Sequence, residues 1–161
     1  MAYVLSVEEK KAFHEDGFLI IPQLINQRDV QELVTHTVDI MQGEVTVPGR
    51  IDPPSPNATI EEIEQRYVRV HQLHLDLEIH ERYLLHTRIL DVLERLIGPD
   101  VMAMQTMLFL KAPEQVGQGY HQDSYYIPPR TDTLCGAWIA LDDADAENRC
   151  VWIVKGTQQE Q

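Results

Sequence analysis

A change of pattern near Gly98 constrains this fold more than any other feature of the chain. Before it, apolar residues recur at helical spacing, as in the segment after Asn26, where they lie three and four positions apart. After it, short apolar runs alternate with turn residues, which is typical of strands. Helices and strands segregated along a chain favour an α+β or mainly β fold over alternating βαβ units. We therefore expect N-terminal helices packed on a sheet from the second half.

Local signals set the expected helices. Ser6 with Glu9, and Thr59 with Glu62, have the spacing of capping boxes, in which each residue's side chain bonds the other's backbone. The expected helices cover residues 6–16, with a stop at residue 17, then 26–41, a short segment after 59, and 75–97 in two pieces with a cap at residue 87.

The expected strands cover residues 18–21, 67–73, 101–111, 117–122, 131–141 and 150–154. Residues 42–57 contain four prolines, so we interpret them as a surface loop or lid. A length of 161 residues predicts a single domain, 1–161.

Composition narrows the function classes. A formal net charge of −13 disfavours nucleic acids and anionic membranes as partners. The longest apolar stretch, residues 101–110, is half of what a membrane span needs, and the N-terminus lacks the pattern of a signal peptide. We expect a cytoplasmic protein with a small-molecule substrate. Cys135 and Cys150 are interpreted as buried thiols, with a disulfide as the open alternative.

The string His121-Gln122-Asp123 carries the strongest chemical signal. On a strand, residues two apart point to the same side, so the imidazole and the carboxylate could chelate one divalent metal ion. A second histidine would complete the two-His-one-carboxylate set that binds Fe(II), but no histidine follows Asp123. The alternative is that Asp123 simply holds a surface histidine. The other candidates, at positions 71, 74, 80 and 86, are interpreted as solvated or core-edge histidines and not as ligands.

Four stretches carry a resemblance to a known family. They read FHEDGFLIIPQLI (13–25), GPDVMAMQTMLFLKAP (98–113), GQGYHQDSYYIPP (117–129) and GAWIALDDADAENRCVWIVKGT (136–157). Together they resemble the phytanoyl-CoA dioxygenase family of Fe(II)/2-oxoglutarate oxygenases. The resemblance implies a double-stranded β-helix, which is a jelly roll of cupin type, present here without its C-terminal strands.

The resemblance also implies roles for individual residues. His121 and Asp123 match iron ligands, and Met107 and Trp138 match positions that line the 2-oxoglutarate site. Gln105 would share the strand face of Met107, either as a pocket wall or through a cross-strand hydrogen bond. The remaining candidates are basic residues for the co-substrate and residues near the ligands or the substrate: Arg69, Lys111, Gln122 and Tyr126. The carboxylate of Asp123 favours hydroxylation over halogenation.

Departures from the family pattern fall near the end of the chain. The distal histidine ligand and the arginine that would pair with 2-oxoglutarate have no match. Residues 148–150 read NRC where the family has Asn-Gly-Cys, and residues 155–158 read KGTQ where it has Pro-Gly-Ser/Thr-His. We expect a truncated or frameshifted product whose open strand edges invite self-association.

Three functions therefore stand at this point. The first is an Fe(II)- and 2-oxoglutarate-dependent dioxygenase that uses O2 to hydroxylate a small organic substrate. The second is an inactive remnant or binding module of that family. The third is an unrelated metal-dependent hydrolase in which a His-Asp pair activates water.

Overall fold

The computed structural model describes residues 3–66, 69–112, 117–129, 131, 133–148 and 150–159. The chain divides into two compact units. The first unit comprises Met1–Ile25, Thr87–Met102 and Gly117–Gln161, and the second comprises Asn26–His86 and Ala103–Val116. The expected single domain across residues 1–161 stays a prediction.

Two helices of the first unit confirm the expected capping signals and helical spacing. Helix α1 (Val7–Asp16) has a complete capping box, with Glu9 N donating to Ser6 Oγ at 3.1 Å and Ser6 N donating to Glu9 Oε2 at 2.8 Å. Gly17 ends it in the left-handed region, as predicted. Helix α5 (Thr87–Ile97) contacts α1, and Thr87 begins the helix instead of capping it.

The remaining described residues of the first unit contain the short helix α6 (Asp123–Tyr126) and the 3-10 helix η2 (Thr157–Gln159), but no strand. The strands expected at 18–21, 117–122, 131–141 and 150–154 are therefore wrong for their described residues. Val151, Trp152, Ile153 and Val154 are 57, 64, 51 and 52% exposed, so neither alternating face of this segment is covered. A strand also needs a neighbour for its backbone groups, and no strand among the described residues pairs with this segment.

The helices of the second unit also begin where local signals place them. Helix α2 (Gln27–Gln42) starts after Asn26, whose side chain accepts from Asp29 N at 2.9 Å. The reciprocal bonds between Thr59 and Glu62 precede α3 (Ile60–Arg66). The 3-10 helix η1 (Leu73–Leu75) and α4 (Glu78–Leu84) follow. Together with α5, α4 confirms a helical stretch in two pieces between 75 and 97.

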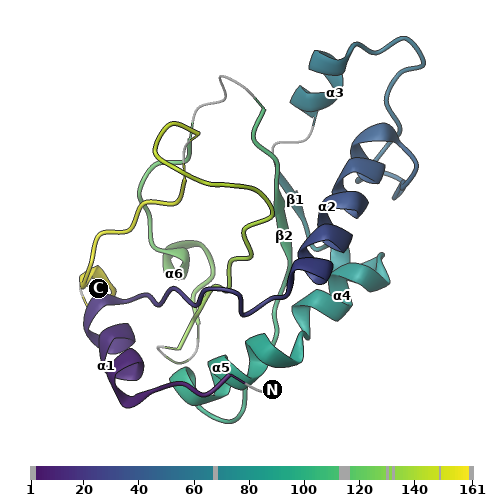
Figure 1. Cartoon of the computed structure of the whole chain (residues 1–161). Coiled ribbons are helices and arrows are strands. Elements are labelled where there is room, and N and C mark those ends of the chain that lie inside the picture. Colours follow the sequence, from purple (N-terminus) through teal and green to yellow (C-terminus); the bar gives the residue numbers. More distant parts are fainter. Residues whose placement is uncertain are drawn as a thin grey trace. The chain divides into compact units, whose positions relative to one another are not determined.

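A two-stranded antiparallel sheet joins β1 (Arg69–His71) and β2 (Met107–Phe109). Both strands are shorter than expected. Residues 67 and 68 lie outside the described residues, and β2 is limited by its three-residue partner, with one further bond from Gln72 N to Thr106 O. Helices with a small antiparallel sheet agree with the α+β class. Figure 1 traces these elements along the chain.

Apolar side chains from helices, strands and the proline-rich loop form the core of the second unit. Its buried apolar residues are Leu33, Ile40, Val47, Ile51, Val70, Leu73, Tyr83 and Leu108. Residues 42–57 are thus not simply a surface loop, because Val47 and Ile51 form a β-bridge and are buried. Among the described residues, no helix has both the length and the apolar character needed to cross a bilayer.

Candidate metal centre

The structure places His121 and Asp123 side by side. His121 Nε2 lies 3.3 Å from Asp123 Oδ1. The expected neighbourhood is confirmed, but its expected cause is wrong, because these residues do not share a strand. Instead, Asp123 opens α6, and Tyr125 N donates to Gln122 O at 3.1 Å as the chain turns. The turn into a short helix brings the two side chains together.

The hydrogen bonds of His121 fix which ring nitrogen is available to a metal ion. Nδ1 lies 2.8 Å from the carbonyl oxygen of Gly119, and a carbonyl can only accept, so Nδ1 carries the proton. In the neutral ring the lone pair is then on Nε2, which faces Asp123. The amide nitrogen of Gln118 lies 3.4 Å from the same Nε2. Ligating histidines are commonly oriented by such a backbone carbonyl.

The spacing of the two donor atoms suits one shared ion. Two atoms bound at about 2.1 Å to one metal ion, at right angles, are separated by about 3.0 Å. The observed separation of 3.3 Å is close to that value. A lone pair and a carboxylate oxygen at this distance repel each other unless a cation or a proton lies between them. The pair therefore fits two ligand positions of a divalent ion. Within the described ranges, no group of three or more His, Cys, Asp or Glu side chains is placed to complete the set.

The pair is half exposed and bordered by aromatic rings. The side chains of His121 and Asp123 are 29% and 54% exposed. The Tyr126 ring packs edge-on against His121, with 5.6 Å between ring centroids, and Tyr125 packs in the same way on Tyr126. A methyl group built at Gly136 would lie 3.9 Å from Asp123 Oδ2, so this residue also borders the pair. Trp138 is 61% exposed.

Gln122 makes a contact that the sequence did not indicate. Its side-chain amide donates to the carbonyl oxygen of Thr157 at 2.8 Å. Sequence reasoning proposed Gln122 as support for the ligands but found no partner for it. The Gly119 carbonyl was also missed as the partner of His121. Backbone carbonyls leave no trace in residue type, so no sequence signal could have identified either partner.

Most residues expected around the co-substrate lie in the second unit, whereas Trp138 belongs to the first. Arg69 and Met107 lie on the exposed face of the β1–β2 sheet, while Val70 and Leu108 on the other face are buried. His71 shares the exposed face, because it pairs with Met107. Phe109, opposite Arg69, is the fourth member. The two-residue alternation from Met107 to Phe109 was the signal that could have added the aromatic residue.

Gln105 and Lys111 lie outside β2, on either side of it. Gln105 is half-buried and Lys111 is exposed. Thr106 makes the described contacts across to the first strand's end: its carbonyl accepts from Gln72 N at 2.8 Å, and its hydroxyl lies 3.2 Å from His74 Nδ1.

Three other histidines of the second unit, His36, His80 and His86, contact neighbouring protein side chains. His80 is buried and packs edge-on against His36, with 5.1 Å between ring centroids. Burial, with smaller contributions from the neighbouring imidazoles of His36 and His74, lowers the pKa of His80 to about 4. Burial also lowers the pKa of His36, against the opposing effect of nearby carboxylates. His86 Nε2 lies 3.5 Å from Asp29 Oδ2. Of the histidines that the sequence analysis interpreted as solvated or core-edge residues, His80 is confirmed as a residue of the core.

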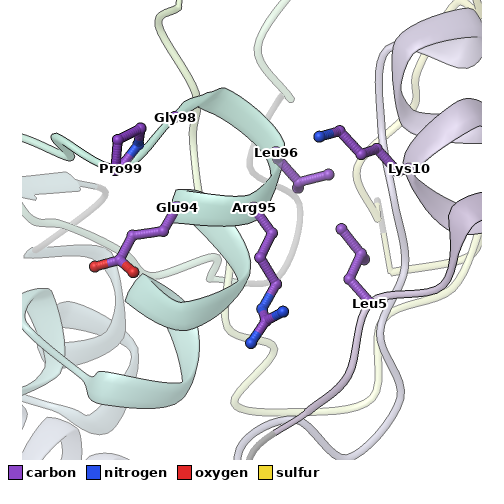
Figure 2. Close-up of a pocket in the computed structure, with 7 residues that line it drawn as sticks. All are labelled: Leu5, Lys10, Glu94, Arg95, Leu96, Gly98 and Pro99. Atoms are coloured by element: carbon purple, nitrogen blue, oxygen red, sulfur yellow. The ribbon is translucent and has the colours of Figure 1, made fainter.

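A cavity of about 470 Å³ lies within the first unit, between α1 and the C-terminal end of α5. Figure 2 shows Leu96 of α5 pointing toward Lys10 and Arg95 extending on the side of the helix where Leu5 lies, while Glu94 points away. None of the residues that the sequence nominated for the site lines this cavity. The two cysteines are free thiols, which settles the open alternative against a disulfide, and burial raises the pKa of Cys135.

Comparison with known proteins agrees with the resemblance seen in the sequence. The family model "Phytanoyl-CoA dioxygenase (PhyH)" matches residues 13–161. Peroxisomal phytanoyl-CoA dioxygenases of Bos taurus and Homo sapiens are 32% and 30% identical to this chain, over 97% of it and 48% of their own length. A probable phytanoyl-CoA dioxygenase of Caenorhabditis elegans is 27% identical, over 97% of this chain and 54% of its own.

No solved structure matches the chain. The chain spans about half the length of the curated relatives it matches. The family match nonetheless covers most of its residues, including both residues of the His121–Asp123 pair and every residue nominated for the co-substrate. This chain belongs to the phytanoyl-CoA dioxygenase family.

Proposed function

We propose that this chain forms the iron-binding part of an Fe(II)- and 2-oxoglutarate-dependent dioxygenase that hydroxylates a small organic substrate with O2. His121 Nε2 and Asp123 Oδ1 would hold the metal ion. The observation that carries the proposal is their separation of 3.3 Å, with the Nδ1 proton of His121 engaged by Gly119. Membership of a dioxygenase family supports the same reaction class.

Bound Fe(II) supplies the redox chemistry that lets O2 and 2-oxoglutarate oxidise an unactivated C–H bond. The chain's own residues bind and orient. Gly119 holds the imidazole in the tautomer that presents Nε2, and the carboxylate of Asp123 offsets the charge of the ion. The Tyr126 ring restricts the rotation of His121 and shields one side of it from water.

For the co-substrate, we propose that Arg69 binds a carboxylate of 2-oxoglutarate beside Met107. Both side chains belong to the exposed sheet face, and guanidinium groups bind carboxylates through two parallel hydrogen bonds. Gln105 and Lys111, which belong to the same unit, are the further candidates beside it. The family resemblance also nominates Trp138 for 2-oxoglutarate. An Arg69→Met variant should raise the KM for 2-oxoglutarate more than it lowers kcat.

We further propose that the family domain completes a jelly roll in which the segments after Gly117 become strands. The apolar run Val151–Val154 supports this, because it has strand composition and its side chains are more than half exposed in the part of the chain that the structure describes. Open edges of this kind would also promote self-association. The cytoplasmic location expected from the sequence stays a prediction, and mammalian relatives carry the description peroxisomal.

The direct test is to measure, by NMR, the formation of succinate from 2-oxoglutarate with and without added Fe(II). Turnover should require Fe(II) and should be lost in His121→Ala and Asp123→Ala, whereas Asp143→Asn, an exposed acid outside the pair, should keep it. Succinate formation that is equal in all four proteins would contradict the proposed ligands.

A binding module without turnover is the second candidate. It is favoured by the lack of a third His, Cys, Asp or Glu ligand beside the pair in the part of the chain that the structure describes. It predicts metal binding that depends on His121 and Asp123, with no succinate at any Fe(II) concentration. Zn(II)-dependent hydrolysis without 2-oxoglutarate would instead identify the pair as a hydrolase centre.

A further inference from the structure

The segment Val154–Gln159, here called the strap, joins the candidate metal pair to the end of the first helix. Figure 1 shows this C-terminal turn, in yellow, beside the purple helix α1. We propose that the strap is a positioning element, which holds the His121–Asp123 pair in its chelating geometry by tying Gln122 to α1. The inference rests on the proposed metal-binding function of the pair.

The strap reaches the pair through the residue between the two ligands. Gln122 Nε2 donates to Thr157 O at 2.8 Å. The strap itself is folded into a turn, since Thr157 Oγ1 donates to Val154 O at 2.9 Å and Gln159 N donates to Gly156 O at 3.3 Å. Because Gln122 is bonded in sequence to both ligands, fixing its side chain restricts the backbone from which both ligand side chains leave.

The strap is anchored on backbone groups that a helix leaves without partners. The last carbonyls of an α-helix have no intrahelical donor. Here Gly156 N donates to Asp16 O at 3.0 Å, and the side-chain amides of Gln158 and Gln159 donate to His14 O at 3.0 and 3.2 Å. The amide of Gln158 also lies 3.4 Å from Glu15 O. Three consecutive helix carbonyls are thus satisfied by one short segment.

A charged contact strengthens the same attachment. Lys155 Nζ lies 2.8 Å from Asp16 Oδ2 and 5.5 Å from the centroid of the Phe18 ring. A cation at the C-terminal end of a helix is also favoured by the helix dipole. The ion pair and the backbone bonds thus fall on the last turn of α1, and the ring contact falls two residues after it.

Gly17 makes room for the strap. It has a φ of +84°, which is the left-handed region, and a side-chain carbon built there would overlap the Gln158 amide oxygen. Gly17, which the sequence predicts as the end of the helix, therefore also leaves the space that Gln158 occupies, 141 positions later in the chain (158 minus 17). The geometry of the helix end and the position of the strap depend on the same glycine.

Two variants test the two attachments of the strap separately. Gln122→Leu removes the bond to Thr157, and Lys155→Met removes the ion pair on α1. Lys11→Met is the matched control, since Lys11 pairs with Glu15 on α1 at 3.6 Å without contacting the strap. Hydrogen exchange of the metal-free proteins should show faster exchange across residues 117–126 in both variants and no change there in the control.

A second measurement asks whether the strap positions the ligands. Co(II) binding, followed by its visible absorption, should be about tenfold weaker in Gln122→Leu, with a shifted spectrum and unchanged helix content, because partners behind metal ligands typically contribute this much. Unchanged exchange across residues 117–126 in both variants would overturn the proposal. So would Co(II) affinity and a spectrum equal to those of the wild type.

The two proposals fail in different ways. If the wild-type chain takes up no Co(II), the metal-binding function is overturned, and the exchange experiment still decides whether the strap holds the loop. If the wild type binds Co(II) and both variants match it in every measurement, the metal function stands and the strap is overturned.

Discussion

The two units differ in how they treat their apolar residues. The second unit buries such residues from α2, β1, β2 and the loop around Ile51 in a shared core. In the first unit, the buried apolar residues among those described lie on α5, while Tyr120, Trp138 and Trp152 are 73, 61 and 64% exposed. The His121–Asp123 pair lies in this less covered region. Sites that must admit ligands are commonly drawn from segments with few buried contacts.

Truncating one apolar side chain in each unit tests most strongly whether the two units differ in apolar burial. Ile40 is 0% exposed, so Ile40→Ala should lower the free energy of unfolding by about 2–5 kcal/mol. Trp152→Ala should change it by less than about 0.5 kcal/mol, because that side chain is already exposed. Urea unfolding measures both. An equal loss in the two variants would show that residues 151–154 are packed in solution.

The buried His80 should make the second unit sensitive to acid. Its pKa is lowered by burial from 6.5 to about 4, so between these values the unfolded chain binds a proton that the folded chain excludes. The contribution of His80 to the free energy of unfolding should be fully present above about pH 6.5. It should fall by about 3 kcal/mol as the pH approaches 4.

Carboxylates titrate in the same range, so the measurement is the difference between variants. Urea midpoints at several pH values should show a shallower acid loss for His80→Gln than for the wild type. Parallel pH profiles for wild type and His80→Gln would contradict a buried neutral imidazole.

A smaller effect is expected at Tyr83, where α4 meets α2. Its hydroxyl donates toward Glu32 Oε2 at 2.7 Å and lies 3.0 Å from Asp29 O. Tyr83→Phe should cost about 1.5 kcal/mol of unfolding free energy, because it removes a hydrogen bond to a charged group. Tyr125→Phe, at an 83% exposed ring in the first unit, should cost less than about 0.5 kcal/mol. Equal losses would remove this contrast between the units.

The parts of the fold that were predictable depend on residues a few positions apart. The caps at Ser6, Asn26 and Thr59 are confirmed, because each is made with the residue three positions later. The strands after Gly117 failed, since a strand depends on a neighbour that its own residues do not specify. Within the site, the sequence predicted that His121 and Asp123 lie close together, but it attributed this to a shared strand and not to the turn into α6. The bond between Gln122 and Thr157 spans 35 residues and ends on a carbonyl, so nothing in the local pattern could reveal it.

The central claim is that His121 and Asp123 share one divalent ion. Mn(II) titrated into the isotopically labelled chain should first broaden the NMR signals of residues 119–126, at less than one equivalent. Because a chain with a net charge of −13 also attracts cations weakly over its surface, Asp142→Asn serves as the control and should keep this pattern. Asp123→Ala should lose it. Broadening that spreads evenly over acidic segments, or that is the same in Asp123→Ala and the wild type, would contradict the account.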